Sequence, residues 1–81
     1  MSDVKEQVKR FILEEFLPGA EPEELTETTP LIAGGILDSL ATMKLVTFIE
    51  TTFGIKIEAH EADEDKLGTL RDIERLIQSK R

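Results

Sequence analysis

The chain has 81 residues, a formal net charge of −7 and 40% hydrophobic residues, which fits one small domain over residues 1–81. It contains no cysteine and a single histidine, His60, so disulfides, thiolate metal sites and a cysteine nucleophile are excluded. We expect no metal site, because carboxylates almost alone would have to supply the ligands.

The negative charge is concentrated in the middle of the chain. Residues 18–37 carry −4 and residues 38–65 carry −5, whereas residues 66–81 carry +3. Repulsion from phosphates disfavours nucleic-acid binding, and an acidic surface favours a basic protein partner. No stretch resembles a signal peptide or approaches the roughly 20 apolar residues of a membrane span. We therefore expect a cytoplasmic protein without membrane insertion, and we expect it to be a monomer.

The first predicted element is an amphipathic helix with Asp3 as its N-cap and Glu6 as the capping-box partner, and it ends near Leu17. Its apolar residues recur at helical spacing, with two leucines widening the stripe: Val4, Val8, Phe11, Ile12, Leu13, Phe16 and Leu17. The pair Pro18-Gly19 ends it.

A long connection over residues 18–37 follows. Three prolines and several threonines and glutamates keep it irregular, and a loop of this length in a small domain is usually functional or held by its own contacts. The expected contacts are made by the apolar residues near its end, namely Leu31, Ile32, Ile36 and Leu37. Pro30 could start a single helical turn before Gly34-Gly35 breaks it.

A second amphipathic helix is predicted from Ser39 to Phe53, ended by Gly54. Its expected apolar face holds Leu40, Met43, Val46, Phe48, Ile49 and Phe53, with Leu45 at the flank. Residues 55–57 then predict an extended connector with both isoleucines turned inward, and residues 61–65 one weak helical turn.

The last predicted helix starts at a cap, Thr69, with Asp72 three residues later, and turns Leu70, Ile73, Leu76 and Ile77 inward. The fold class is therefore all-α. We expect a small four-helix bundle of three main helices and one short helix, with a long first loop.

Ser39 is the most informative candidate residue. It lies where a glycine-containing loop gives way to the second helix, at the positive end of a helix dipole, which suits a phosphate-linked group. The alternative from position alone is that its hydroxyl only caps the helix. A hydrolase with Ser39 as nucleophile and His60 as base is a third interpretation, although the G-x-S-x-G elbow is absent.

The wider pattern resembles the attachment region of acyl carrier proteins and related phosphopantetheine-binding carrier domains. The matching residues are the triplet Asp38-Ser39-Leu40, then Thr42, Leu45, Val46, Ile49, Glu50 and Phe53. Length, acidity, the long first loop and the closing helix match as well, so the resemblance covers nearly the whole chain.

The resemblance implies that a phosphopantetheinyl transferase attaches 4'-phosphopantetheine from coenzyme A to Ser39, next to Asp38 and Leu40. The arm would carry acyl, aminoacyl or peptidyl groups as thioesters for loading and transferring enzymes, and the chain would itself have no catalytic residue. We expect Leu40 to anchor the helix behind Ser39. The expected partner face holds Leu37, Asp38, Met43, Lys44, Thr47, Glu50 and Thr51.

Three pathway classes stay open for this stand-alone carrier: fatty-acid, polyketide and specialised pathways. Lys44 and the pair Thr51-Thr52 stand where fatty-acid carriers commonly have carboxylates. The stretch over residues 35–41 is also more similar to carriers of specialised pathways, which favours a pathway of that kind. The alternative function is an unmodified acidic module that binds a basic partner through its second helix.

Overall fold

A computed structural model describes residues 3–80, apart from the side chains of Asp3 and Glu64. The main helices are α1 (Asp3–Phe16), α2 (Ser39–Phe53) and α4 (Leu70–Lys80), and a short helix, α3 (Glu64–Leu67), precedes α4. Two 3-10 turns, η1 (Pro22–Glu24) and η2 (Ala59–Glu61), interrupt the connections, and residues 3–80 contain no strand. The predicted all-α bundle of three main helices and one short helix is confirmed.

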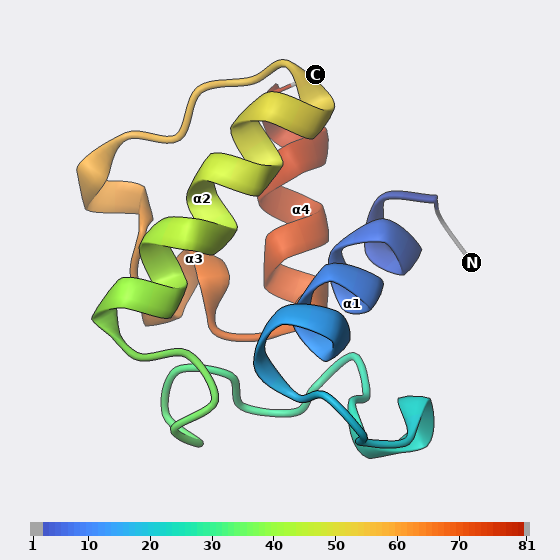
Figure 1. Ribbon diagram of the computed structural model, residues 1–81. Coiled ribbons are helices and arrows are strands. Elements are labelled where there is room, and N and C mark those ends of the chain that lie inside the picture. The colour runs from blue at the N-terminus through green and yellow to red at the C-terminus, as the bar shows by residue number, and fades with distance from the viewer. Residues whose placement is uncertain (1–2, 81) are drawn as a thin grey trace.

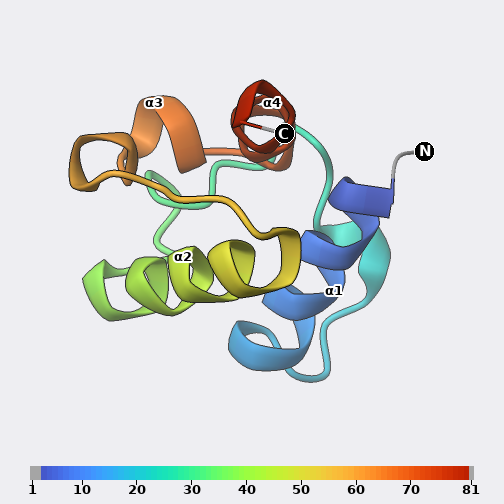
Figure 2. The ribbon, with the colours of Figure 1, turned by 90° about the horizontal axis from the view of Figure 1, so that it is seen from above.

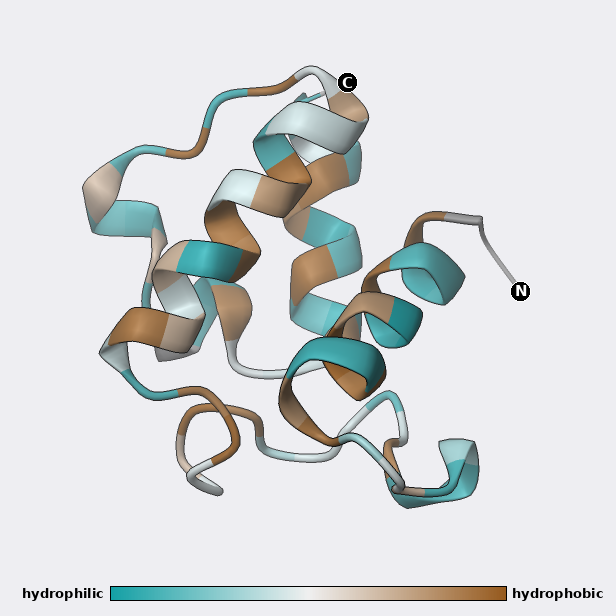
Figure 3. Ribbon diagram, in the orientation of Figure 1, coloured by the Kyte–Doolittle hydropathy of each residue, from teal (hydrophilic) through white to brown (hydrophobic). Residues whose placement is uncertain are grey.

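Each main helix buries one face in a common core. α1 packs against α4 and α2, and α3 packs against α4 (Figures 1 and 2). Figure 3 shows hydrophobic and hydrophilic stretches interleaved along α1, α2 and α4, the pattern of helices with one buried face. The fully buried side chains come from every main helix and from both connections, and the largest are Ile12, Leu25, Leu31, Leu45, Ile49, Leu67, Leu70, Ile73 and Ile77. No helix within residues 3–80 is both long and apolar enough to cross a membrane.

The buried face of α2 differs from the predicted one. Leu45 is fully buried, whereas Leu40 is 68% exposed and Met43 58% exposed. The buried residues Ala41, Thr42, Leu45, Val46 and Ile49 share one face at helical spacing, which turns residue 40 away from the core. The prediction that Leu40 anchors the helix is therefore wrong.

The first connection, residues 17–38, is held firmly against the bundle. Its backbone is tied to the start of α4, since Leu31 N–H donates to the Gly68 carbonyl oxygen (2.7 Å) and Arg71 N–H donates to that of Glu27 (3.1 Å). Leu31 and Leu37 are buried as predicted, and Leu25, which the pattern did not single out, is also fully buried.

The helical turn expected to start at Pro30 and to be broken by Gly34-Gly35 does not form. A hydrogen-bonded turn lies two residues later, from Ile32 to Gly35, and includes both glycines. A side chain at Gly34 would collide with the Pro30 carbonyl oxygen, so the chain can close this turn only with glycine there. The 3-10 turn η1 forms earlier, at Pro22–Glu24, where no turn was predicted.

The second connection begins at Gly54, whose φ of 66° ends α2 in the left-handed conformation, as predicted. The extended stretch that follows buries Ile57 and part of Ile55, also as predicted. The single turn expected at residues 61–65 instead forms as two elements, η2 and α3. Asp63 separates them, because its side chain accepts a hydrogen bond from Lys66 N–H and caps α3.

Candidate functional site

The start of α2 is capped by Asp38. Its backbone is extended (φ −85°, ψ −173°) and its Oδ1 accepts a hydrogen bond from Ala41 N–H at 2.8 Å. Ser39 is the first helical residue and is exposed, and its hydroxyl makes no hydrogen bond within the described part of the chain. The cap interpretation of Ser39 is therefore wrong. Asp38 accepts the hydrogen bond from an amide in the first turn of α2, and the exposed serine hydroxyl is available to react.

The electrostatic surroundings of Ser39 suit an anion. The amides of Ser39 and Leu40 point out of the first turn and have no acceptor among the described residues. The positive end of the helix dipole stabilises a negative charge placed there by a few tenths to about 1 kcal/mol.

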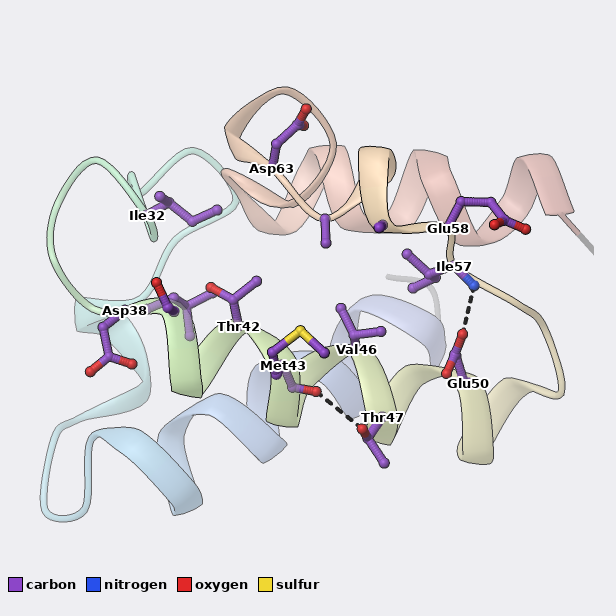
Figure 4. Close-up of a pocket in the computed structure, with 14 residues that line it drawn as sticks. Ile32, Asp38, Thr42, Met43, Val46, Thr47, Glu50, Ile57, Glu58 and Asp63 are labelled. Atoms are coloured by element: carbon purple, nitrogen blue, oxygen red, sulfur yellow. Dashed lines mark hydrogen bonds between the residues drawn. The ribbon is translucent and has the colours of Figure 1, made fainter.

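A groove of about 850 Å³ begins beside Ser39. It lies between α2 and the segment from Ile57 to Asp63, with Asp38 at one end and Glu50 and Ile57 at the other (Figure 4). Its wall on α2 includes Thr42, Met43 and Val46, and the facing wall includes Ala59 and Ala62. The Ser39 hydroxyl thus lies beside a largely apolar groove that could shelter a tethered group.

Lys80 fixes the turn that carries part of the facing wall. Its Nζ lies 2.8 Å from Glu61 Oε1 and so ties η2 to the end of α4. The hydrogen bond from Lys80, together with one from the Glu58 backbone, lowers the pKa of the Glu61 carboxyl below its ordinary value.

The expected partner face is only partly present at the surface. Met43, Lys44, Thr47 and Thr51 are exposed on α2, and the Thr47 hydroxyl donates to the Met43 carbonyl oxygen at 3.1 Å. Leu40, which was assigned to the interior, joins this face. Together with Met43 it accounts for the large exposed apolar side chains among residues 3–80.

Two members of the predicted partner face lie elsewhere. Leu37 is only 2% exposed, because it packs into the core beneath the first connection and lines the groove. Glu50 is half-buried and turned into the groove, where its Oε2 accepts a hydrogen bond from Ile57 N–H at 2.8 Å (Figure 4). The sequence pattern gave no sign of this bond, since it depends on the path of the second connection.

The hydrolase interpretation gains no support. His60 is exposed in η2 and is absent from the lining of the groove that Ser39 faces. Within the described residues, no cluster of histidine, aspartate or glutamate is arranged to hold a metal ion.

The family model for the phosphopantetheine attachment site matches residues 10–77, and the chain belongs to this family of carrier proteins. A chain of a solved structure described as "Crystal structure of FAD-dependent dehydrogenase" is 34% identical and superposes with a TM-score of 0.77. The alignment covers 86% of this chain and 97% of that chain, so the two are of similar length.

Membership confirms the predicted family and its cofactor, a covalently attached 4'-phosphopantetheine, and indicates a carrier rather than a catalyst. The residues at the start of α2 fit this group. Ser39 offers an exposed and unbonded hydroxyl, the first turn of α2 offers free amides for a phosphate, and the groove starts beside them.

Proposed function

We propose that Ser39 is the residue that carries 4'-phosphopantetheine, and that the chain acts as a cytoplasmic carrier of thioester-bound acyl or aminoacyl intermediates. The observation that supports this proposal is that Asp38 and Ser39 have different roles at the start of α2. Asp38 caps the helix through Ala41 N–H, so the neighbouring hydroxyl has no structural task and stays exposed.

In loading, Ser39 Oγ replaces the adenosine bisphosphate half of coenzyme A on the pantetheine phosphate, and its proton passes to the transferase. The attached group supplies a thiol that forms thioesters with the cargo, which explains how a chain without cysteine can carry one. Asp38 keeps the first turn in place, and the free amides of that turn would be the hydrogen-bond donors for the phosphodiester. The walls of the groove, among them Val46 and Ala62, exclude water from a group that lies in it.

We propose that the transferase and the acyl-handling enzymes dock on the exposed side of α2, which includes the rim of the groove at Met43. Leu40 and Met43 offer apolar contact next to Ser39, and Lys44, Thr47 and Thr51 continue the surface. Exposed large apolar side chains beside an attachment point are the expected anchors of a transient interface.

The similarity to a chain in a structure described as an FAD-dependent dehydrogenase supports a partner of that class. Such an enzyme would move two hydrogens from the tethered group to the flavin. Mass analysis of the carrier from its host, with the thioester intact, should then show tethered groups that differ by two hydrogen masses. A single tethered species would argue against this partner.

The direct test of the carrier role is incubation with coenzyme A and a broad-specificity phosphopantetheinyl transferase, followed by intact-mass measurement. Wild type should gain one phosphopantetheinyl group and Ser39→Ala should gain none. Ser79→Ala is the matched control, because Ser79 is also exposed on a helix, with its hydroxyl donating to the Leu76 carbonyl oxygen, and it should be modified like wild type. Unmodified wild type, or a gain that survives Ser39→Ala, would favour the acidic interaction module instead.

A further inference from the structure

The far end of the groove is closed by one hydrogen bond. Glu50 lies eleven residues after Ser39 on α2, which places it on the order of 16 Å along the helix axis from the attachment point. There its carboxylate accepts from Ile57 N–H and joins α2 to the facing wall, as Figure 4 shows at the end opposite Asp38.

In the wall segment that this bond holds, the side chains of Ile55 and Ile57 pack against the core, but the backbone lacks other hydrogen bonds to the described residues. No backbone–backbone hydrogen bond within residues 3–80 involves Ile55, Lys56 or Ile57. The segment leaves α2 at the left-handed Gly54, and its one buried side chain is Ile57, which is 6% exposed. A buried amide needs a partner, and the Glu50 carboxylate is the partner that the described residues provide.

The opposite wall of the groove is rigid by comparison. It is the body of α2, where Leu45 and Ile49 are fully buried in the core. The width of the groove at its far end is therefore set by the position of the extended segment. The Ile57 side chain of this segment packs in the core, and the hydrogen bond to Glu50 joins its backbone to α2.

We infer that Glu50 determines which tethered groups this carrier can shelter: its hydrogen bond to Ile57 N–H holds the extended segment against α2 and ends the groove. The inference rests on Ser39 being the attachment residue. A group short enough to end before Glu50 is sheltered, and a longer one must leave the groove or displace the segment.

Hydrogen exchange of the unmodified protein, measured by NMR, tests the bond itself. A hydrogen bond to a charged acceptor is strong enough that Glu50→Ala should speed exchange at the Ile57 amide by about tenfold or more. Glu50→Gln keeps an oxygen acceptor without the charge and should give a smaller increase. Thr52→Ala, at an exposed threonine of α2 outside the proposed docking surface, should leave this amide unchanged.

Protection of the loaded thioester from chemical cleavage tests whether this hydrogen bond limits the length of the sheltered group. The transferase is given butanoyl-, octanoyl- or hexadecanoyl-coenzyme A, and cleavage of the loaded thioester by hydroxylamine is compared with cleavage of the same thioester on free pantetheine. The tethered chain length at which protection is lost should be shorter in wild type and in Thr52→Ala than in Glu50→Ala. Glu50→Gln should lie between them, and it provides the comparison if the alanine variant does not fold.

The same chain-length limit in wild type and in a variant whose Ile57 amide exchanges faster would overturn the inference, as would unchanged exchange in Glu50→Ala. These results are distinct from a failure of the proposed function, which would appear as absence of loading on Ser39. The exchange measurement does not depend on loading.

Discussion

The two connections that flank α2 are built in opposite ways. The first, residues 17–38, contributes three buried leucines, hydrogen-bonds to Gly68 and to the Arg71 amide, and is joined to α1 by an ion pair between Lys5 and Glu27. The second, from Gly54 to Glu58, buries Ile57 and depends on the Glu50 carboxylate. Both connections reach the groove, the first at the Asp38 end and the second at the Glu50 end (Figure 4).

This difference separates two requirements of a carrier. A transferase and several enzymes must find the attachment point at a fixed position, and the firmly held first connection supplies that. A groove that shelters a tethered group must admit and release it, and regions with few buried contacts and few backbone hydrogen bonds open most easily.

The largest expected effect comes from the firmly held connection. Leu31→Ala should lower the free energy of unfolding by about 2–5 kcal/mol, since Leu31 is fully buried. Ile55→Ala in the second connection should cost clearly less, because Ile55 is only half-buried. Urea unfolding followed by circular dichroism measures both, and equal losses would erase the contrast between the connections.

Leu40→Ala tests the finding that Leu40 does not anchor α2 in the core. Since Leu40 is 68% exposed, its loss should change the free energy of unfolding by less than about 0.5 kcal/mol. A loss as large as that of Leu31→Ala would restore Leu40 as the anchor that the sequence predicted.

An intermediate effect is expected at the helix cap. Asp38→Ala should cost about 1 kcal/mol of stability, because Ala41 N–H loses its acceptor, and Asp38→Asn should recover most of it. Ser39→Ala should be nearly neutral, within about 0.5 kcal/mol. Thermal unfolding of the three variants decides which side chain caps α2, and a larger loss for Ser39→Ala would reverse the assignment.

The smallest effect is expected from the surface ion pairs, measured as stability against pH. The carboxyl of Glu27, through its hydrogen bond from Lys5, and that of Glu61, through Lys80, both have a pKa below the ordinary 4.5. Their contribution to the free energy of unfolding is therefore present above about pH 4.5. It is lost as the pH falls through the lowered pKa values of the folded state.

Lys80→Gln tests one half of this prediction. It should reduce the loss of stability at acid pH that comes from Glu61 and leave the loss that comes from Glu27. The urea midpoint at a series of pH values is the measurement, and an unchanged pH dependence in Lys80→Gln would contradict it.

Much of the fold follows from local patterns. The bounds of α2 follow from its period and from Gly54, and α4 begins where predicted because Thr69 Oγ1 accepts from Asp72 N–H at 3.1 Å. Periodicity could not tell which apolar residues of α2 face the core, since Leu40 and Leu45 both fit a helix and only packing against α1 and the connections separates them. The roles of Leu25 and Glu50 depend on where irregular segments return to the bundle, and no local pattern encodes that path.

The most direct measurement is fragmentation mass spectrometry of wild-type protein loaded from coenzyme A. It assigns the added mass to one residue within the sequence around the start of α2. We expect the whole of it on Ser39, whose hydroxyl is left free by the Asp38 cap. A phosphopantetheinyl group found on any other side chain would contradict that expectation.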